Sequence, residues 1–266
     1  NQKRRIFAFI CIMTMIVALC YTPTTFAATT KSFKTSGKTI VPIVKKGKEI
    51  SKNTNAALKE AARLGKKGKI YTVKLPKGTY YISESLKIWS NTTLDATGCT
   101  IKTKKTGFNM VATGSSEDNR KATGYKRYTN ISIKGGTWVN NKKNKSSSIR
   151  LCRGSNITLK NIDMSHGSEK HMVEMAAVDG VKIINCKFHD SDIKDSKEKC
   201  EAVQLDICAN ETAYSSIIYD GSPCKNIQIK GNTFENVSRG VGTHSMLLNN
   251  YIDNVIIEDN TFKNIT

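Results

Sequence analysis

Side chains that could carry acid–base chemistry recur in four short segments of one pattern. Each segment has an apolar residue at its third position, so the four can be superposed with that residue facing inward. The segments are Ser147–Cys152, His171–Ala176, Glu201–Asp206 and Arg239–His244, with Ile149, Val173, Val203 and Val241 inward. This pattern predicts four strands stacked in register.

The superposition arranges the other positions of these strands in columns. One outward column holds Arg150, Glu174, Gln204 and Gly242, the next holds Cys152, Ala176, Asp206 and His244, and the corner holds Ser147, His171, Glu201 and Arg239. Carboxylates, imidazoles and guanidinium groups therefore gather on one face, which we term the polar face. It is the candidate functional site.

Glu174 and Asp206 are the predicted acid and base of a glycoside hydrolysis. They lie one strand apart and two residues along it, and neighbouring strands about 4.8 Å apart then give a separation of about 8 Å. That distance admits a water molecule and favours inversion, whereas a covalent mechanism needs about 5 Å. Asp206, next to His244, is expected to stay ionised as the base, and Glu174, near Met172 and Met175, to be the acid.

The remaining polar residues have predicted supporting roles. Glu201, His171, His244 and Arg239 would complete the catalytic set, while Arg150, Gln204 and the loop residues Tyr214 and Tyr219 would bind substrate. Arginine side chains suit this task because the guanidinium fork matches a carboxylate or sulfate. A polysaccharide lyase remains open, with Arg239 or His244 abstracting a proton beside a uronate carboxyl.

The same charges also permit a non-catalytic interpretation. Glu174 would pair with Arg150, Glu201 with Arg239 and Asp206 with His244, as cross-strand salt bridges on a solvated face. The protein would then be a cell-wall-binding or adhesive solenoid.

A repeated sequence motif must form the strands that position these residues. Its five copies are Asn130–Trp138, Asn156–Met164, Gly180–Phe188, Asn226–Phe234 and Asn254–Phe262. Within each copy apolar residues alternate with polar ones, then Gly, Asn or Asp permits a tight bend, then a large apolar residue follows. Period two and a repeat of 20–50 residues predict an all-β, right-handed parallel β-helix with Ile131, Ile157, Val181, Ile227 and Val255 stacked inward.

The N-terminal part of the sequence differs from the repeats. Residues 1–27 combine a basic start with an apolar run and small residues, which indicates a secretory signal peptide. Residues 28–50 are expected to be a linker, 51–69 a capping helix that begins at an Asn or Thr cap, and 70–266 the β-helix. Because no capping element follows the fifth copy, we expect the β-helix to be truncated at Thr266.

Three stretches resemble a known group of proteins. The helix Asn53–Leu64, the stretch Leu75–Ser83 (LPKGTYYIS) and the stretch Ser90–Gly98 (SNTTLDATG) are similar to the N-terminal cap and first coils of the pectate-lyase-like superfamily. The resemblance covers residues 51–266 and implies the fold together with carbohydrate-active relatives, among them glycoside hydrolases, lyases and non-catalytic adhesins. The signature residues of polygalacturonases and pectate lyases are absent from the sequence. No catalytic residue can therefore be carried over.

The net charge narrows the classes of molecule that this protein could bind. The formal charge of +20 falls to +17 without residues 1–27, which hold three basic and no acidic side chains. Such a charge favours an acidic polysaccharide or anionic cell-wall glycan, outside the cell or at its surface, over nucleic acid. No stable membrane span is expected once the signal is removed.

The sequence gives little sign of a metal or cofactor. No CxxC pair indicates zinc, and the acidic run Asp190–Glu198 lacks the glycine of a calcium loop, so a solvated turn is the favoured interpretation over Ca²⁺. Cys152 and Cys186 are expected to be buried thiols, and Cys208 and Cys224 to form a disulfide at the base of the loop between them.

Overall fold

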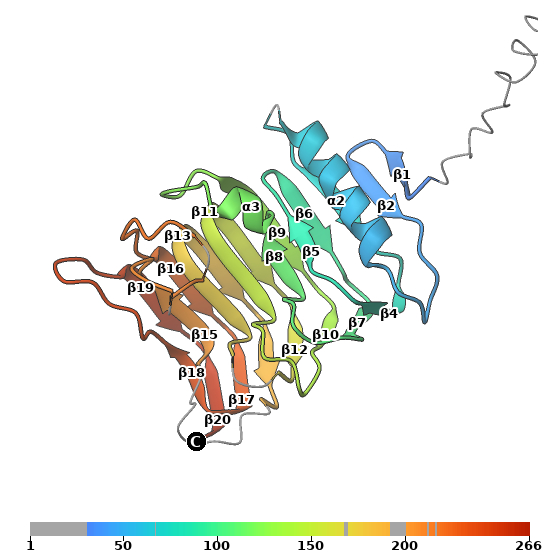
Figure 1. Ribbon diagram of the computed structural model, residues 1–266. Helices are drawn as coiled ribbons and strands as arrows, with labels where there is room; N and C mark the ends of the chain where they lie inside the picture. Colours follow the sequence, from blue (N-terminus) through green and yellow to red (C-terminus); the bar gives the residue numbers. More distant parts are fainter. Residues whose placement is uncertain (1–30, 67, 168–169, 192–200, 212, 216) are drawn as a thin grey trace, which may run out of the picture. The chain divides into compact units, whose positions relative to one another are not determined.

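The computed structural model describes residues 31–66, 68–167, 170–191, 201–211, 213–215 and 217–266. The predicted signal peptide and most of the acidic run after Asp190 lie outside these residues. Residues 32–266 form one compact unit in which the chain winds through two sheets of stacked strands (Figure 1). No described helix is long and apolar enough to cross a membrane.

The two sheets contain nearly all of the regular structure. The larger sheet contains β1 (Phe33–Ser36), β2 (Thr39–Pro42), β3 (Tyr71–Lys74), β5 (Leu86–Ile88), β6 (Thr92–Asp95), β8 (Val111–Thr113), β9 (Tyr128–Lys134), β11 (Ile149–Lys160), β13 (Val173–Ile184), β15 (Glu201–Asp206), β16 (Lys225–Lys230), β18 (Arg239–Gly242) and β19 (Asp253–Glu258). The smaller sheet contains β4 (Gly78–Ile82), β7 (Cys99–Thr103), β10 (Thr137–Val139), β12 (Asp163–Ser165), β14 (Lys187–His189), β17 (Thr233–Val237) and β20 (Thr261–Ile265). Apart from the antiparallel β1–β2 pair, the paired strands of both sheets are parallel, which confirms the predicted parallel β-helix.

Two columns of side chains fill the interior as predicted. In the first strand of each coil, Ile131, Ile157, Val181, Ile227 and Val255 lie in register. In the second, Trp138, Met164, Phe188, Phe234 and Phe262 do the same. The last three rings stack with centroids 5.4 and 4.9 Å apart. Because every coil repeats this pattern, each side chain covers the one before it.

A ladder of asparagines marks a backbone bend at or near the start of the first strand of several coils. Asn91, Asn130 and Asn156 have φ of 53–58°, a left-handed conformation that asparagine tolerates. The side-chain amide of Asn130 donates to Asn91 at 2.8 Å, and that of Asn156 donates to Asn130 at 2.7 Å. Asn254 and Asn226 repeat the contact at 2.7 Å. The recurrence of asparagine at this position of the repeat therefore reflects both backbone conformation and hydrogen bonding between coils.

The N-terminal region differs from the expectation in two ways. Residues 33–42 of the predicted linker form the hairpin β1–β2, and β2 pairs in parallel with β3. Helix α2 spans Ser51–Gly65 and begins after Ile50, because the Asn53 amide donates to the Ile43 carbonyl at 2.6 Å rather than capping the helix. Helix α2 buries Ala57, Leu58 and Ala61 against the first coils.

Candidate functional site

The polar face has the predicted register. β11, β13, β15 and β18 pair so that Arg150, Glu174, Gln204 and Gly242 form one column. In the next column Cys152, Ala176 and Asp206 align, whereas His244 lies beyond the end of β18. β11 and β13 each continue through a bend, at Arg153 and Ala177 with φ of 56° and 52°, into the first strand of the next repeat.

The centre of the polar face is buried, contrary to the solvated face of the non-catalytic interpretation. Exposure is 7% for Glu174, 3% for Glu201 and 0% for both Gln204 and Asp206. A Cβ atom at Gly242 would lie 2.8 Å from Glu201 Cγ, so the glycine lets β18 pass directly over this side chain. Charges buried to this degree need partners, because an unpaired one would destabilise the fold by several kcal/mol.

The loop between Cys208 and Cys224 covers part of this face. Tyr214 and Ile217 pack against Cys152 and Ala176 in a small apolar cluster. The Arg150 guanidinium lies 3.6 Å from the centre of the Tyr214 ring. Burial raises the pKa of Tyr214 well above its usual value, so this hydroxyl stays protonated. The second predicted binding residue of the loop, Tyr219, is 43% exposed.

Arg153, which the sequence analysis did not single out, anchors this loop. Its side chain is completely buried, and Nη1 donates to Asp220 at 2.6 Å. Nη2 donates to the Ile218 carbonyl and lies 3.2 Å from Cys208 Sγ. Although partial burial opposes the charge of Asp220, the hydrogen bonds from Arg153 and from two backbone amides hold the pKa of Asp220 below its usual value. The pair therefore stays ionised and ties the loop to the bend of β11.

Glu174 is held by one hydroxyl donor and one guanidinium group. The Ser147 hydroxyl donates to Oε2 at 2.6 Å, and Arg150 Nε lies 3.1 Å from the same oxygen. Burial alone would lower the pKa of Arg150, but attraction to Tyr214 and Glu174 raises it above its usual value. The predicted acid is thus held as half of a buried ion pair.

Asp206 accepts more hydrogen bonds than Glu174 does. Its Oδ1 accepts hydrogen bonds from the Thr243 hydroxyl at 2.9 Å and from the amides of His244 and Ser245 at 3.1 Å. Its Oδ2 accepts one from Gln204 and lies 3.7 Å from His244 Nε2. With no exposed surface, this carboxylate fixes the chain that follows β18.

His171, Glu201, His244 and Arg239 come together at the corner of the face. Glu201 Oε2 lies 3.5 Å from His171 Nδ1 and 4.0 Å from His244 Nδ1, and Oε1 lies 3.1 Å from Arg239. His171 Nδ1 is also 2.9 Å from the Glu201 carbonyl, and burial lowers the pKa of His171. Three ligand atoms within 4.8 Å of one another make His171, Glu201 and His244 the group, among the described residues, that could hold a metal ion.

Three cavities of the described structure, two of them at the polar face, differ greatly in size. One that touches Glu201, Met172 and Ala202 holds about 10 Å³, and one beside Arg150 and Tyr214 holds about 200 Å³. A third cavity lies beside α2, away from the polar face, and holds about 920 Å³. Pockets for organic ligands are typically about 300–1,000 Å³, so only the third of these has room for an oligosaccharide.

The cysteine predictions had mixed outcomes. Cys152 and Cys186 are buried free thiols, as expected. The predicted disulfide between Cys208 and Cys224 is wrong, because both are free and their sulfur atoms have different neighbours. Cys208 Sγ faces Arg153 and the Ile218 carbonyl, while Cys224 Sγ lies 3.5 Å from the Met175 carbonyl.

Solved structures share the architecture of this chain. Two structures of PfbA, a surface adhesin of Streptococcus pneumoniae, match with TM-scores of 0.65 and 0.69 and identities of 20% and 21%. They cover 80% and 82% of this chain, but the chain spans only 59% and 58% of PfbA. A candidate glycosyl hydrolase from Parabacteroides merdae matches with a TM-score of 0.51 and 10% identity, over 82% of this chain and 88% of that one.

These similarities establish the fold. No family model matches the sequence, and no curated protein matches it either. The parallel β-helix is shared by an adhesin and by a candidate carbohydrate-active enzyme, so the architecture is compatible with binding and with catalysis.

Proposed function

We propose that this protein is an extracellular or cell-surface β-helix that binds anionic glycans without cleaving them. The observation that carries the proposal is the engagement of the predicted acid and base. Glu174 is held by Ser147 and Arg150, and Asp206 is fully buried with three donors on one oxygen. A general acid or base must reach its substrate within hydrogen-bonding distance, whereas Asp206 has no exposed surface and Glu174 is only 7% exposed, with Oε2 occupied by Ser147 and Arg150.

Charge and architecture support binding. The formal net charge, +20 for the sequence and +17 without residues 1–27, attracts polyanions over several ångströms of solvent. PfbA, which has the same fold at low identity, is a surface adhesin. The chain spans less than two thirds of PfbA, and surface location and binding are the two properties that we propose for it.

Retention on immobilised polygalacturonate and on heparin, measured at rising salt, tests this function. We expect the protein to bind at low ionic strength and to elute at moderate salt, because contacts between exposed charges are screened. Reducing ends and ultraviolet-absorbing unsaturated sugars should not accumulate during long incubation. Retention on neutral dextran equal to that on the acidic matrices, or steady release of product, would contradict the proposal.

Glycan cleavage is the second candidate function, because one cluster reaches solvent. The side chains of Arg239 and His244 are 52% and 34% exposed, yet both contact the buried Glu201. In a lyase, His244 would take the proton beside a uronate carboxyl held by Arg239. A carbon–carbon double bond then forms, the bond to the departing sugar oxygen breaks, and that oxygen takes a proton from solvent. In a hydrolase, Glu174 and Asp206 would act as acid and base, with Glu201 and His171 in support.

Four variants separate these reactions if any glycan is cleaved. His244→Ala should abolish elimination while leaving the fold intact, since this side chain lies partly in solvent. Asp206→Asn and Glu174→Gln should abolish hydrolysis, and Arg150→Gln shows the effect of removing the cation that pairs with Glu174 and packs on Tyr214. Wild-type turnover in both isosteric carboxylate variants would exclude the hydrolytic pair.

A further inference from the structure

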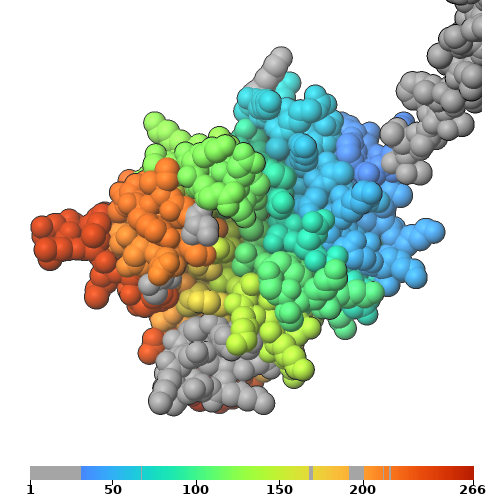
Figure 2. Space-filling model, in the orientation of Figure 1, coloured from blue at the N-terminus to red at the C-terminus, as the bar shows by residue number. Residues whose placement is uncertain are grey.

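The largest of the three cavities lies away from the polar face, along helix α2. It is bounded by α2, by β5 and by the short helix α3 (Ser116–Asn119), and it holds about 920 Å³. We call it the α2 groove. Figure 2 shows the atoms of α2, in cyan, beside those around α3, in green, on one face of the molecule.

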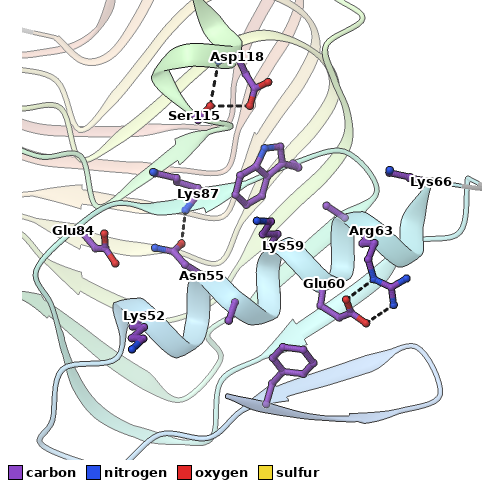
Figure 3. A pocket seen from close by; sticks show the side chains of 14 residues that line it. Lys52, Asn55, Lys59, Glu60, Arg63, Lys66, Glu84, Lys87, Ser115 and Asp118 are labelled. Carbon is purple, nitrogen blue, oxygen red and sulfur yellow. Dashed lines mark hydrogen bonds and ion pairs between the residues drawn. The ribbon is translucent and has the colours of Figure 1, made fainter. Parts of the chain in front are cut away.

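Helical periodicity places a row of lysines in the α2 groove. Lys52, Lys59 and Lys66 recur every seven residues, close to two helical turns, and all three are exposed. Ala56 and Ala62, which also line the groove, lie between these lysines in the sequence, and their small side chains leave the space beside α2 open. With a rise of 1.5 Å per residue, the Cα atoms of successive lysines in this row are roughly 10.5 Å apart along the helix axis. Figure 3 shows them along α2 with Lys87 of β5 nearby.

The lysines of the groove are not neutralised by the protein. Lys52, Lys59, Lys66 and Lys87 make no side-chain hydrogen bond or ion pair with any described residue, whereas Lys121, Lys187 and Lys230 elsewhere pair with carboxylates. Two acids that line the groove are already engaged: Glu60 with Arg63 at 2.7 Å, and Asp118 with Arg127. Glu84 is the remaining carboxylate of the lining. The groove therefore presents an excess of unpaired positive charge.

An aromatic surface accompanies these charges. Trp89, which follows β5, lines the groove and is half-buried, so part of its indole ring faces the cavity. A flat apolar ring beside cationic groups suits a ligand that is itself part apolar and part acidic, because the ring can stack while the charges pair. Sugars with carboxylate or sulfate groups have this composition.

The edge of β5 is closed to a peptide strand. Asn55 of α2 donates to the Ser85 carbonyl at 2.9 Å and accepts from the Lys87 amide at 2.8 Å. These are the backbone groups that a bound strand would need for β-augmentation. Recognition in the groove must therefore use side chains, which favours a glycan over an extended peptide.

We infer that the α2 groove binds an acidic oligosaccharide, with Lys52, Lys59, Lys66 and Lys87 pairing with its carboxylates or sulfates and Trp89 stacking on a sugar ring. This inference rests on the proposed function and gives it a location that the polar face does not provide.

Tryptophan fluorescence offers a site-specific test. The chain has two tryptophans, and Trp138 is completely buried in the interior column, so a ligand-induced change reports on Trp89. The full chain is titrated with a heparin-derived hexasaccharide, with a galacturonate hexamer and with a neutral glucose hexamer. We expect both acidic oligomers to change the emission in a salt-sensitive way and the neutral one to have no effect.

Matched charge variants locate the binding. The triple variant Lys52→Gln, Lys59→Gln and Lys66→Gln should weaken binding at least tenfold. The control Lys105→Gln, Lys160→Gln and Lys182→Gln removes three exposed charges outside the groove and should weaken it less than twofold. Trp89→Phe should abolish the fluorescence change and retain binding by calorimetry. All of these residues lie at least partly in solvent, so folding should be preserved.

Each other outcome overturns a stated part of the inference. Equal losses in both triple variants would show diffuse surface charge rather than a site. Acidic glycan retention without any change in Trp89 emission would place binding elsewhere and leave the proposed function standing. No retention of either acidic oligomer by the wild type would refute the proposed function itself. Tighter binding to polyglutamate, or to vesicles containing phosphatidylserine, would replace the glycan by an acidic peptide or a membrane.

Discussion

The same coils carry two columns of side chains with opposite chemistry. The interior column runs through Phe188, Phe234 and Phe262 and consists of apolar rings stacked about one strand spacing apart. The column of the polar face runs through Arg150, Glu174 and Gln204, and it is buried just as deeply in its centre. One column is covered by the next coil, whereas the other is covered by loops that polar contacts hold in place.

This difference separates what stabilises the fold from what shapes its surface. Apolar stacking is non-directional and repeats in each coil. The polar contacts are directional and specific to one place, as between Arg153 and Asp220 or between Asp206 and Ser245. Substitutions in the two columns should therefore have effects of different size and range.

Phe234→Ala should have the largest effect on stability. The ring is completely buried between Phe188 and Phe262, and its removal hollows the column, so the free energy of unfolding should fall by about 3–5 kcal/mol. Chemical denaturation followed by circular dichroism measures the change. Phe262→Ala is the matched control, because this ring is 48% exposed and its loss should be much smaller. Similar losses in the two variants would contradict a stacked interior column.

Arg153→Met should have the next largest effect. Removing the buried guanidinium leaves Asp220 without its ion-pair partner and three contacts of the loop unmade. Loss of one partner of a fully buried pair costs about 3–5 kcal/mol, but Asp220 is 18% exposed, so we expect about 2–3 kcal/mol. Hydrogen exchange should increase in the loop that contains Tyr214 and not in β16. Exchange that increases equally in both segments would mean that Arg153 supports the whole coil.

The contrast between the two columns also explains which structural features could be predicted from the sequence. Register was predictable because inward residues alternate with period two, and so Val173, Val203 and Val241 aligned correctly. Burial of the polar face was not predictable, because it depends on a loop whose anchor, Arg153, looks like one more basic residue at a turn. The only signal was its position beside a strand bend, directly after Cys152.

The N-terminal region shows the same limit. Alternation is short in residues 33–42, so the hairpin β1–β2 resembled a linker. The heptad spacing of Lys52, Lys59 and Lys66 was visible in the sequence, but its meaning depends on where Trp89 and α3 lie relative to α2. Local patterns predict elements, whereas a groove between elements requires their packing.

Acid should weaken the polar face before it affects the interior column. Burial lowers the pKa of His171 below its usual value, even though Glu174 and Glu201 favour its charged form. As pH falls below about 6.5, His171 therefore takes up a proton in the unfolded chain before it does so in the folded protein. The free energy of unfolding is highest above that pH and decreases as pH falls towards the folded-state pKa of His171. The thermal midpoint should be lower at pH 5.5 than at pH 7.5, with a smaller difference in His171→Gln. An identical pH dependence in both proteins would assign the acid sensitivity to other groups.

Asn226→Ala should have the smallest effect, because the asparagine ladder is exposed and lies outside both columns. The substitution removes the hydrogen bonds to Asp179 and Asn254, each 2.7 Å, from a solvent-accessible position. It also places an alanine at φ of 55°, a left-handed conformation that alanine tolerates less well than asparagine, so we expect a loss of about 1 kcal/mol. Asn226→Gly loses the same hydrogen bonds but tolerates the left-handed conformation. If glycine restores most of the stability, the ladder acts through backbone conformation; if glycine is as destabilising as alanine, the hydrogen bonds between coils are the larger contribution.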